Sequence, residues 1–176
     1  MKKIMVLFLA VLMMTSFLAG CGPKKAEAKV VDLKEIHAAI KEGFGEDYYP
    51  NMEMDMEIIK NQIGISEDNI ESIIAESPMI SVNIDTFIAV KAKEGKGETI
   101  EAELEKYRTN LVENSMMYPM NIAKANSAKV VRHGDYVFFL MFGKYDDRLE
   151  ASDEERLEFA KVEIQKAEDI INKFFE

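Results

Sequence analysis

The sequence predicts an α+β fold, in which an N-terminal helical segment precedes a ferredoxin-like strand-helix-strand-strand-helix unit with a small, mostly antiparallel sheet. Three features of the apolar pattern favour this class. Apolar residues repeat at helical spacing near both ends of the mature chain, alternate with a period of two around residue 86, and run without polar alternation over 137–142. With 176 residues, 48% of them hydrophobic and 31% charged, the chain has the size and composition of one domain.

The N-terminal helical segment is predicted to contain three helices that pack as a lobe. The first begins at the N-cap residue Asp32 and ends at Gly45. A short second helix ends at Gly64. A third begins at the N-cap residue Ser66, carries isoleucines at helical spacing and ends at Pro78.

The remaining chain is predicted as a strand, a helix, two strands joined by a tight turn at His133-Gly134, and a last helix. The predicted ranges are 81–92, 97–111, 129–132, 135–142 and 152–174. Residues 115–126 form an irregular or helical connection. The last helix opens with a capping box, Ser152 with Glu155. In a ferredoxin-like plait the third strand of this unit lies between the other two, which suits its strongly apolar sequence.

The first twenty residues have the order of a bacterial signal peptide, with two lysines followed by an uncharged apolar run. This run breaks at Thr15, so a membrane-spanning helix is a weaker interpretation. Leu18-Ala19-Gly20-Cys21 resembles the lipobox of bacterial lipoproteins, in which the cysteine receives a diacylglycerol and becomes the new N-terminus. The alternative is a secreted protein cut after Gly20 that keeps a free or intermolecularly paired thiol.

These motifs predict three regions: a removed signal peptide (1–20), the lipidated Cys21 with a polar tether (21–29), and a single domain of unknown function (30–176). The diacylglycerol on Cys21 would anchor the protein to the extracytoplasmic face of the cell membrane, because two acyl chains give stable attachment. Loss of two lysines with the signal peptide would change the formal net charge from −10 to −12. Such acidity argues against a nucleic-acid partner.

Catalytic and metal motifs find little support in the sequence. No nucleophile elbow, Walker loop or zincin motif is present, and the chain has two histidines. His37 is predicted on the apolar side of the first helix, and His133 in an exposed turn. Met52, Met54 and Met56 could hold Cu(I), but methionine also fills small cores. We therefore expect no enzymatic activity, no cofactor and no metal centre.

A binding role fits the aromatic loops better. Tyr48 and Tyr49 precede Pro50, and Tyr118 precedes Pro119, so these rings stand outside regular elements. If exposed, they could bind an envelope protein or peptide; if buried, they close the core. A non-enzymatic binding module of the envelope is the first hypothesis, and a solute- or metal-binding lipoprotein is the alternative.

Two segments carry a further likeness. Ile84 to Lys93 is a strand ending in Lys-x-Lys, and Ala128 to Phe138 combines Lys-Val-Val with a Gly-Asp-Tyr-Val-Phe hairpin. With Leu33 to Pro50 upstream, they resemble an uncharacterised domain-of-unknown-function family of small Gram-positive lipoproteins. The resemblance implies the location and the fold, and it transfers no catalytic residues.

Overall fold

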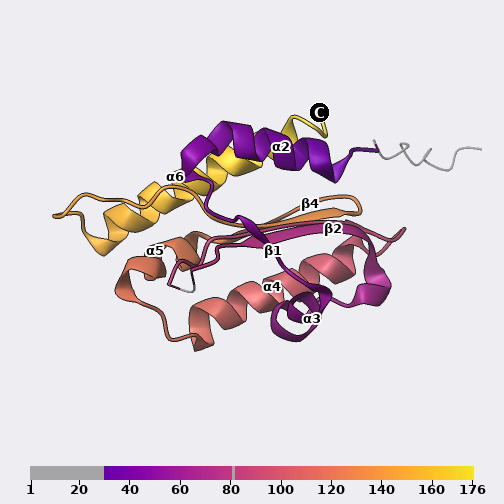
Figure 1. Cartoon of the computed structure of the whole chain (residues 1–176), viewed down its shortest axis with the longest axis horizontal. Helices are drawn as coiled ribbons and strands as arrows, with labels where there is room; N and C mark the ends of the chain where they lie inside the picture. The colour runs from indigo at the N-terminus through magenta and orange to yellow at the C-terminus, as the bar shows by residue number, and fades with distance from the viewer. Residues whose placement is uncertain (1–29, 81) are drawn as a thin grey trace, which may run out of the picture.

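The computed structural model describes residues 30–80 and 82–176 and shows one antiparallel sheet between two layers of helices (Figure 1). The predicted signal peptide, Cys21 and the tether lie outside these residues. The helices are α2 (Leu33–Phe44), α3 (Met56–Ile58), α4 (Gly97–Asn114), α5 (Pro119–Ser127) and α6 (Asp153–Asn172), with short 3-10 or π segments at Gly45–Asp47, Ile59–Ile63 and Glu67–Asn69. The strands are β1 (Met52–Glu53), β2 (Ile70–Ser77), β3 (Thr86–Ala92), β4 (Lys129–His133) and β5 (Tyr136–Met141). The predicted α+β class is confirmed.

The five strands lie in the order β1-β2-β3-β5-β4, and every neighbouring pair is antiparallel. The strand over 136–141 therefore lies between the two others of its unit, as predicted. All six residues of β5 are buried. A strand covered on both faces needs apolar side chains in both directions, which explains its continuous apolar run.

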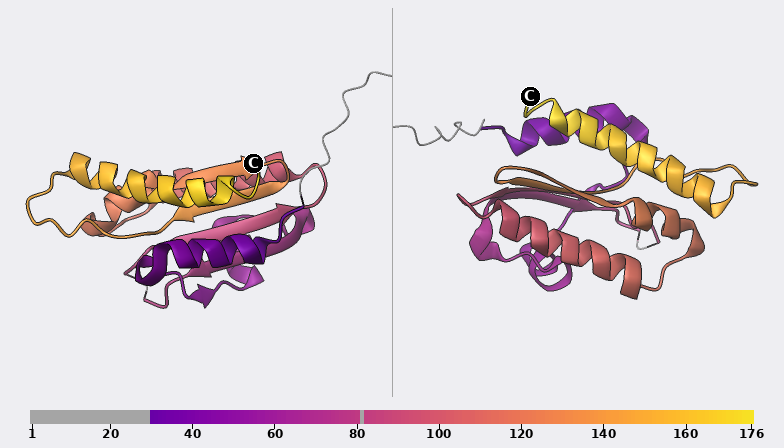
Figure 2. Two further views of the ribbon diagram at one scale, coloured as in Figure 1. Left: turned by 90° about the horizontal axis from the view of Figure 1, so that it is seen from above. Right: turned by 180° about the vertical axis from the view of Figure 1, so that it is seen from behind.

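Successive residues of the central strands supply two separate cores. Phe87, Phe138 and Leu140 pack under α2 and α6, whereas Ile88 and Phe139 pack against α4 on the other face. Figure 2 shows α2 and α6 side by side over one face, with α4 below the opposite face. In a ferredoxin-like plait both helices of the unit share one face. Here α4 and α6 cover opposite faces of the sheet, and α2 shares a face with α6 instead of joining a separate N-terminal lobe.

The predicted third helix is wrong, because Ser66 leads into a single 3-10 turn and residues 70–77 form β2. Adjacent isoleucines explain the error. Ile73 packs with the α4 core and Ile74 with the α2 core, so the two side chains point to opposite faces of the sheet. A short apolar run of this kind fits a helix or a strand equally well by spacing, and its β-branched residues favour the strand.

Two of the three predicted helix caps, Asp32 and Ser152, are confirmed, whereas the Ser66 side chain makes no capping hydrogen bond. The Asp32 carboxylate accepts a hydrogen bond from the Lys34 amide at 2.9 Å, and Ser152 and Glu155 make both hydrogen bonds of a capping box. The start of α2 is also tied to the sheet, since the Val31 amide donates to the Tyr136 hydroxyl at 3.0 Å.

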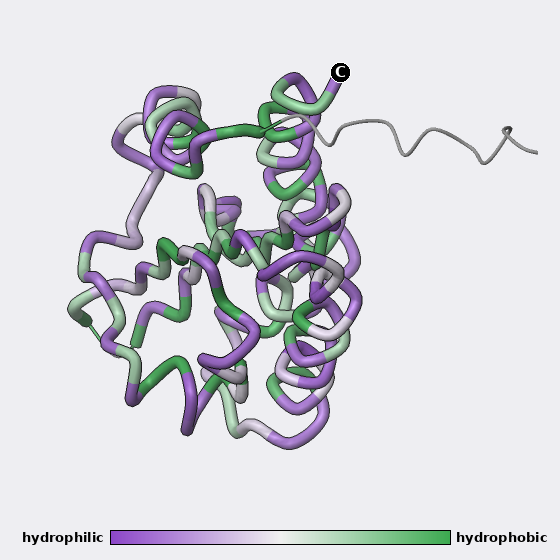
Figure 3. The backbone as a smooth tube through the Cα atoms, turned by 90° about the vertical axis from the view of Figure 1, so that its right-hand side faces the viewer, coloured by the Kyte–Doolittle hydropathy of each residue, from purple (hydrophilic) through white to green (hydrophobic). Residues whose placement is uncertain are grey.

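Hydrophilic and hydrophobic residues alternate along the helices (Figure 3). Within residues 30–80 and 82–176, none of the helices has the length and apolarity required to cross a bilayer.

Candidate functional site

A buried ion pair lies at the end of the sheet where β3 begins and β5 ends. Asp85 directly precedes β3, and Lys124 comes from α5; Lys124 Nζ donates to Asp85 Oδ1 at 2.5 Å. Their exposed fractions are 0% and 3%. The ammonium also donates to the Gly143 carbonyl at 2.7 Å and lies 3.4 Å from the centroid of the Tyr145 ring. Carboxylate, carbonyl and aromatic face together replace the water that burial removes from the ammonium.

The two charges compensate one another. Burial raises the pKa of the Asp85 carboxyl and lowers the pKa of the Lys124 ammonium, and the attraction between the charges opposes both shifts. Burial alone would therefore neutralise each group, whereas the short contact favours the charged forms of both. Neither group can be removed without leaving the other in an apolar environment.

Hydrogen bonds extend the ion pair into a cluster that we call the Lys124 cluster: Asn83, Asp85, Asn121, Lys124 and Tyr145. The Tyr145 hydroxyl donates to Asn121 Oδ1 at 3.1 Å and lies 3.4 Å from acceptor oxygens of Asn83 and Asp85. Burial and the Asp85 charge raise the pKa of the Tyr145 hydroxyl. The side-chain Nδ2 of Asn121 in turn donates to the Val82 backbone carbonyl, in the loop before β3.

The predicted strand over 81–92 begins too early, because β3 begins at Thr86. Asn83 and Asp85, which precede it, belong to the Lys124 cluster. The Asn83 side chain accepts a hydrogen bond from the Asp85 amide at 2.8 Å, and the Asn83 amide donates to the Ile80 carbonyl at 3.0 Å. These local bonds form a turn in place of the sheet ladder.

Two pockets adjoin the Lys124 cluster, and both are lined in part by Met120 and Tyr145. The first has a volume of about 520 Å³, lies between α5, α6 and the loop after β5, and includes Lys144, Asp153 and Arg156 in its lining. The second has a volume of about 470 Å³, and none of its lining residues is charged. Its wall is formed mainly by Tyr49, Met79, Ile80, Val82, Met120 and Tyr145, and we call it the apolar pocket.

The three tyrosines predicted as binding residues differ in how exposed they are. Tyr49, 41% exposed, lines the apolar pocket, and Tyr118, 61% exposed, caps α5. Tyr48 is 9% exposed and donates its hydroxyl proton to Glu76 at 2.8 Å, beside His37. Burial, with this hydrogen bond, raises the pKa of Tyr48. For Tyr48 the core interpretation therefore holds, and the ring does not belong to an accessible surface.

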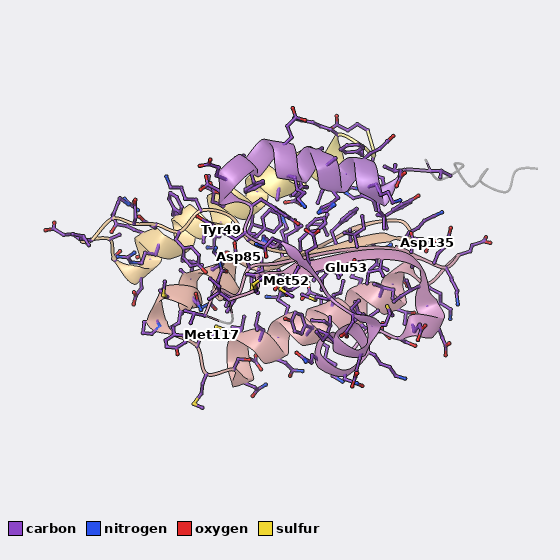
Figure 4. All side chains as sticks on the ribbon, in the orientation of Figure 1. Tyr49, Met52, Glu53, Asp85, Met117 and Asp135 are labelled. Atoms are coloured by element: carbon purple, nitrogen blue, oxygen red, sulfur yellow. The ribbon has the colours of Figure 1, made fainter. Side chains whose placement is uncertain are left out.

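Figure 4 places Tyr49 and Asp85 near the middle of the domain, on the side of the sheet toward α5, and Asp135, in the β4–β5 turn, at the opposite end of the sheet. The apolar pocket thus lies far from the turn that joins the last two strands.

The three methionines at positions 52, 54 and 56 differ in burial, although Met54 and Met56 line one pocket. Met54 is buried in the core on the α4 side, Met52 is exposed, and Met56 packs at the edge of that core. Among the described residues, no three or more His, Cys, Asp or Glu side chains gather as a metal site. His133, at the end of β4, stacks on Phe175 with a ring separation of 4.3 Å.

Sequence reasoning missed the Lys124 cluster. Asp85 and Lys124 are 39 positions apart, and no motif links them. The break in the apolar alternation at Asp85-Thr86 is the one local signal of a turn there.

We expect Lys124→Met to lower the free energy of unfolding by about 3–5 kcal/mol, because the Asp85 carboxylate would remain buried without its counter-charge. The double variant Asp85→Leu/Lys124→Met should recover most of this loss. Lys129→Met is the control, since Lys129 pairs with Glu168 near the surface and should cost about 1 kcal/mol or less. Urea unfolding followed by circular dichroism measures all three, and equal losses for Lys124→Met and Lys129→Met would contradict the assignment.

Comparison with known families adds one match. A family model described as Domain of unknown function (DUF4358) matches residues 45–142, which contain the whole sheet with α3, α4 and α5. No curated protein and no solved structure matches the chain. The matched segment is more than half of the chain and includes Asp85, Lys124 and most of the apolar pocket. The chain therefore belongs to the family described as Domain of unknown function (DUF4358).

Proposed function

We propose that the protein is a lipid-anchored extracytoplasmic lipoprotein whose domain is a non-enzymatic binding module of the cell envelope. The order of lysines, apolar run and Leu18-Ala19-Gly20-Cys21 supports the anchor. The apolar pocket, with exposed large side chains on its wall, supports the binding role.

The exposure of this wall is the observation that carries the proposal. Most exposed large apolar side chains of the described chain come from the loop at Tyr49, the loop at 79–82 without residue 81, and the segment 116–122. The side-chain Nδ2 of Asn121 donates to the Val82 carbonyl at 2.8 Å, so the last two segments are in contact. Scattered apolar side chains are normal on a protein surface, but a contiguous group around a pocket is typical of a binding site.

The position of the pocket also suits a tethered module. Val31 contacts Tyr136 at the start of β5, whereas the Lys124 cluster contacts Gly143 just beyond its end. At about 3.4 Å per residue, β5 separates these two ends by about 17 Å. A tether of residues 21–29 reaches at most roughly 30 Å. The domain would therefore remain close to the bilayer, with its apolar pocket at the end away from the attachment point.

A solute-binding lipoprotein is the second candidate, and the first pocket favours it. Its volume of about 520 Å³ lies in the range of small-molecule sites, and it offers both cationic and anionic side chains beside apolar ones.

The anchor predicts a defined N-terminus for the mature chain. Intact-mass and peptide mass spectrometry of protein extracted from membranes should show a chain that starts at Cys21 and carries a diacylglycerol on its sulfur. The variant Cys21→Ala should incorporate no labelled fatty acid. A mature chain that starts elsewhere, or an unmodified Cys21, would exclude the lipid anchor.

The binding surface is tested by Val82→Asp in the full-length chain. A carboxylate on the pocket wall should reduce chemical crosslinking to a membrane or envelope partner by about tenfold or more, because it would be desolvated by the partner. Val162→Asp is the matched control, since Val162 is an exposed valine on α6 that does not line the apolar pocket. The proposal fails if no partner is crosslinked or if both variants crosslink as the wild type does.

The solute-binding candidate predicts a ligand-dependent rise in thermal stability. A ligand at 100 times its Kd stabilises a protein by about 2.7 kcal/mol, which is easily measured as a shift in Tm. Amino acids, sugars and divalent metal ions form the panel. A shift that disappears in Arg156→Gln would support the first pocket, and an unchanged Tm across the panel would count against it.

A further inference from the structure

Two of the four exposed methionines of the described chain line the apolar pocket. Met79 and Met120, 74% and 60% exposed, both line it. Met116 is fully exposed in the connection that leads to α5. In contrast, Met54 and Met141 are buried in the core on the α4 side of the sheet. An oxidant in the surrounding solution therefore meets the pocket methionines before the core ones.

We propose that Met79 and Met120 form an oxidation-sensitive site, at which peroxides convert the apolar pocket into a polar one and stop it from binding apolar ligands. This inference rests on the proposed binding function of the same pocket. It adds a modification that would regulate binding, with the thioether sulfurs as the reacting atoms.

The modification is an oxygen transfer that needs no group from the protein. A lone pair on the methionine sulfur attacks one oxygen of hydrogen peroxide, the O–O bond breaks and an S–O bond forms. The remaining oxygen leaves as water after proton transfer. Sulfur is oxidised by two electrons and the peroxide is reduced by two, so the reaction yields methionine sulfoxide and water.

The lining of the pocket explains why the modification would change binding. None of the lining residues is charged, and Ile80, Val82 and the methionines provide apolar contact. A sulfoxide oxygen is a strong hydrogen-bond acceptor, which an apolar ligand would cover without offering a donor. The fold itself should persist, because Met54 and Met141 remain shielded in the core.

The test uses Nile red, an uncharged apolar dye, as the probe of the pocket, and hydrogen peroxide as the oxidant. Before oxidation, wild-type protein should bind the dye with enhanced fluorescence. After oxidation, with sulfoxides at Met79 and Met120 confirmed by peptide mass spectrometry and an unchanged circular dichroism spectrum, dye affinity should fall at least about fivefold. Met79→Leu/Met120→Leu keeps apolar walls without sulfur and should bind the dye equally before and after peroxide.

The control variant is Met52→Leu/Met116→Leu, which removes two exposed methionines that do not line the pocket. It should lose dye binding on oxidation as the wild type does. Dye binding that survives full oxidation of Met79 and Met120, or that falls equally in Met79→Leu/Met120→Leu, would overturn the oxidation site while leaving the binding function intact. If unoxidised wild-type protein fails to bind the dye, or binds it as strongly after Val82→Asp, the pocket is not a binding site and both proposals fall.

Discussion

The contact between Lys124 and Asp85 organises the end of the molecule that carries both pockets. It joins three segments that are distant in the sequence: the turn before β3, the helix α5 and the chain that leaves β5 at Gly143. A buried ion pair is favourable only when its remaining donors and acceptors are also satisfied. The Lys124 ammonium meets that condition with a carboxylate, a carbonyl and the face of Tyr145, all of which require the three segments to be in register. The Asp85 carboxylate meets it only in part, because Oδ2 is buried and makes no hydrogen bond among the described residues. The ion pair therefore mainly favours this arrangement of the three segments over other arrangements, whereas the apolar cores supply the driving force for folding.

The central strands, which supply both apolar cores, lead directly into the Lys124 cluster. Thr86 pairs with Met141, so the first residue of β3 and the last of β5 lie side by side just before the Lys124 cluster begins. Tyr145 then lies where its ring covers the Lys124 ammonium and also forms part of the wall of both pockets. Packing of the sheet thus determines where the ion pair can form, and the ion pair determines the position of the shared wall.

The sequence predicted correctly those features that depend on interactions between residues close together in the chain. The caps of α2 and α6 and the central position of β5 followed from residue types that satisfy backbone groups or cover both faces of a strand. Spacing failed for β2, because Ile73 and Ile74 fit either period. Spacing also could not predict that Tyr48 is buried while Tyr49 is exposed. The backbone at Tyr48 is extended, and neighbouring side chains of an extended chain point in opposite directions. Tyr48 therefore points to the core and Tyr49 to the pocket. The Lys124 cluster depends on tertiary contacts across 39 positions, for which the sequence holds no local signal.

The walls of the apolar pocket differ in how firmly they are fixed. Tyr145 is restrained by the Lys124 cluster. Met79 and Ile80 lie in a loop to which α5 is linked by the hydrogen bond from the Asn121 side chain to the Val82 carbonyl. Methionine has more rotatable bonds than the other apolar residues and adapts to ligands of different shape. A ligand would therefore meet one rigid wall and one adaptable wall, and the adaptable one carries the oxidisable sulfur of Met79. The property that lets this wall fit a ligand is also the property that makes it sensitive to peroxide, because both depend on an exposed, unbranched thioether.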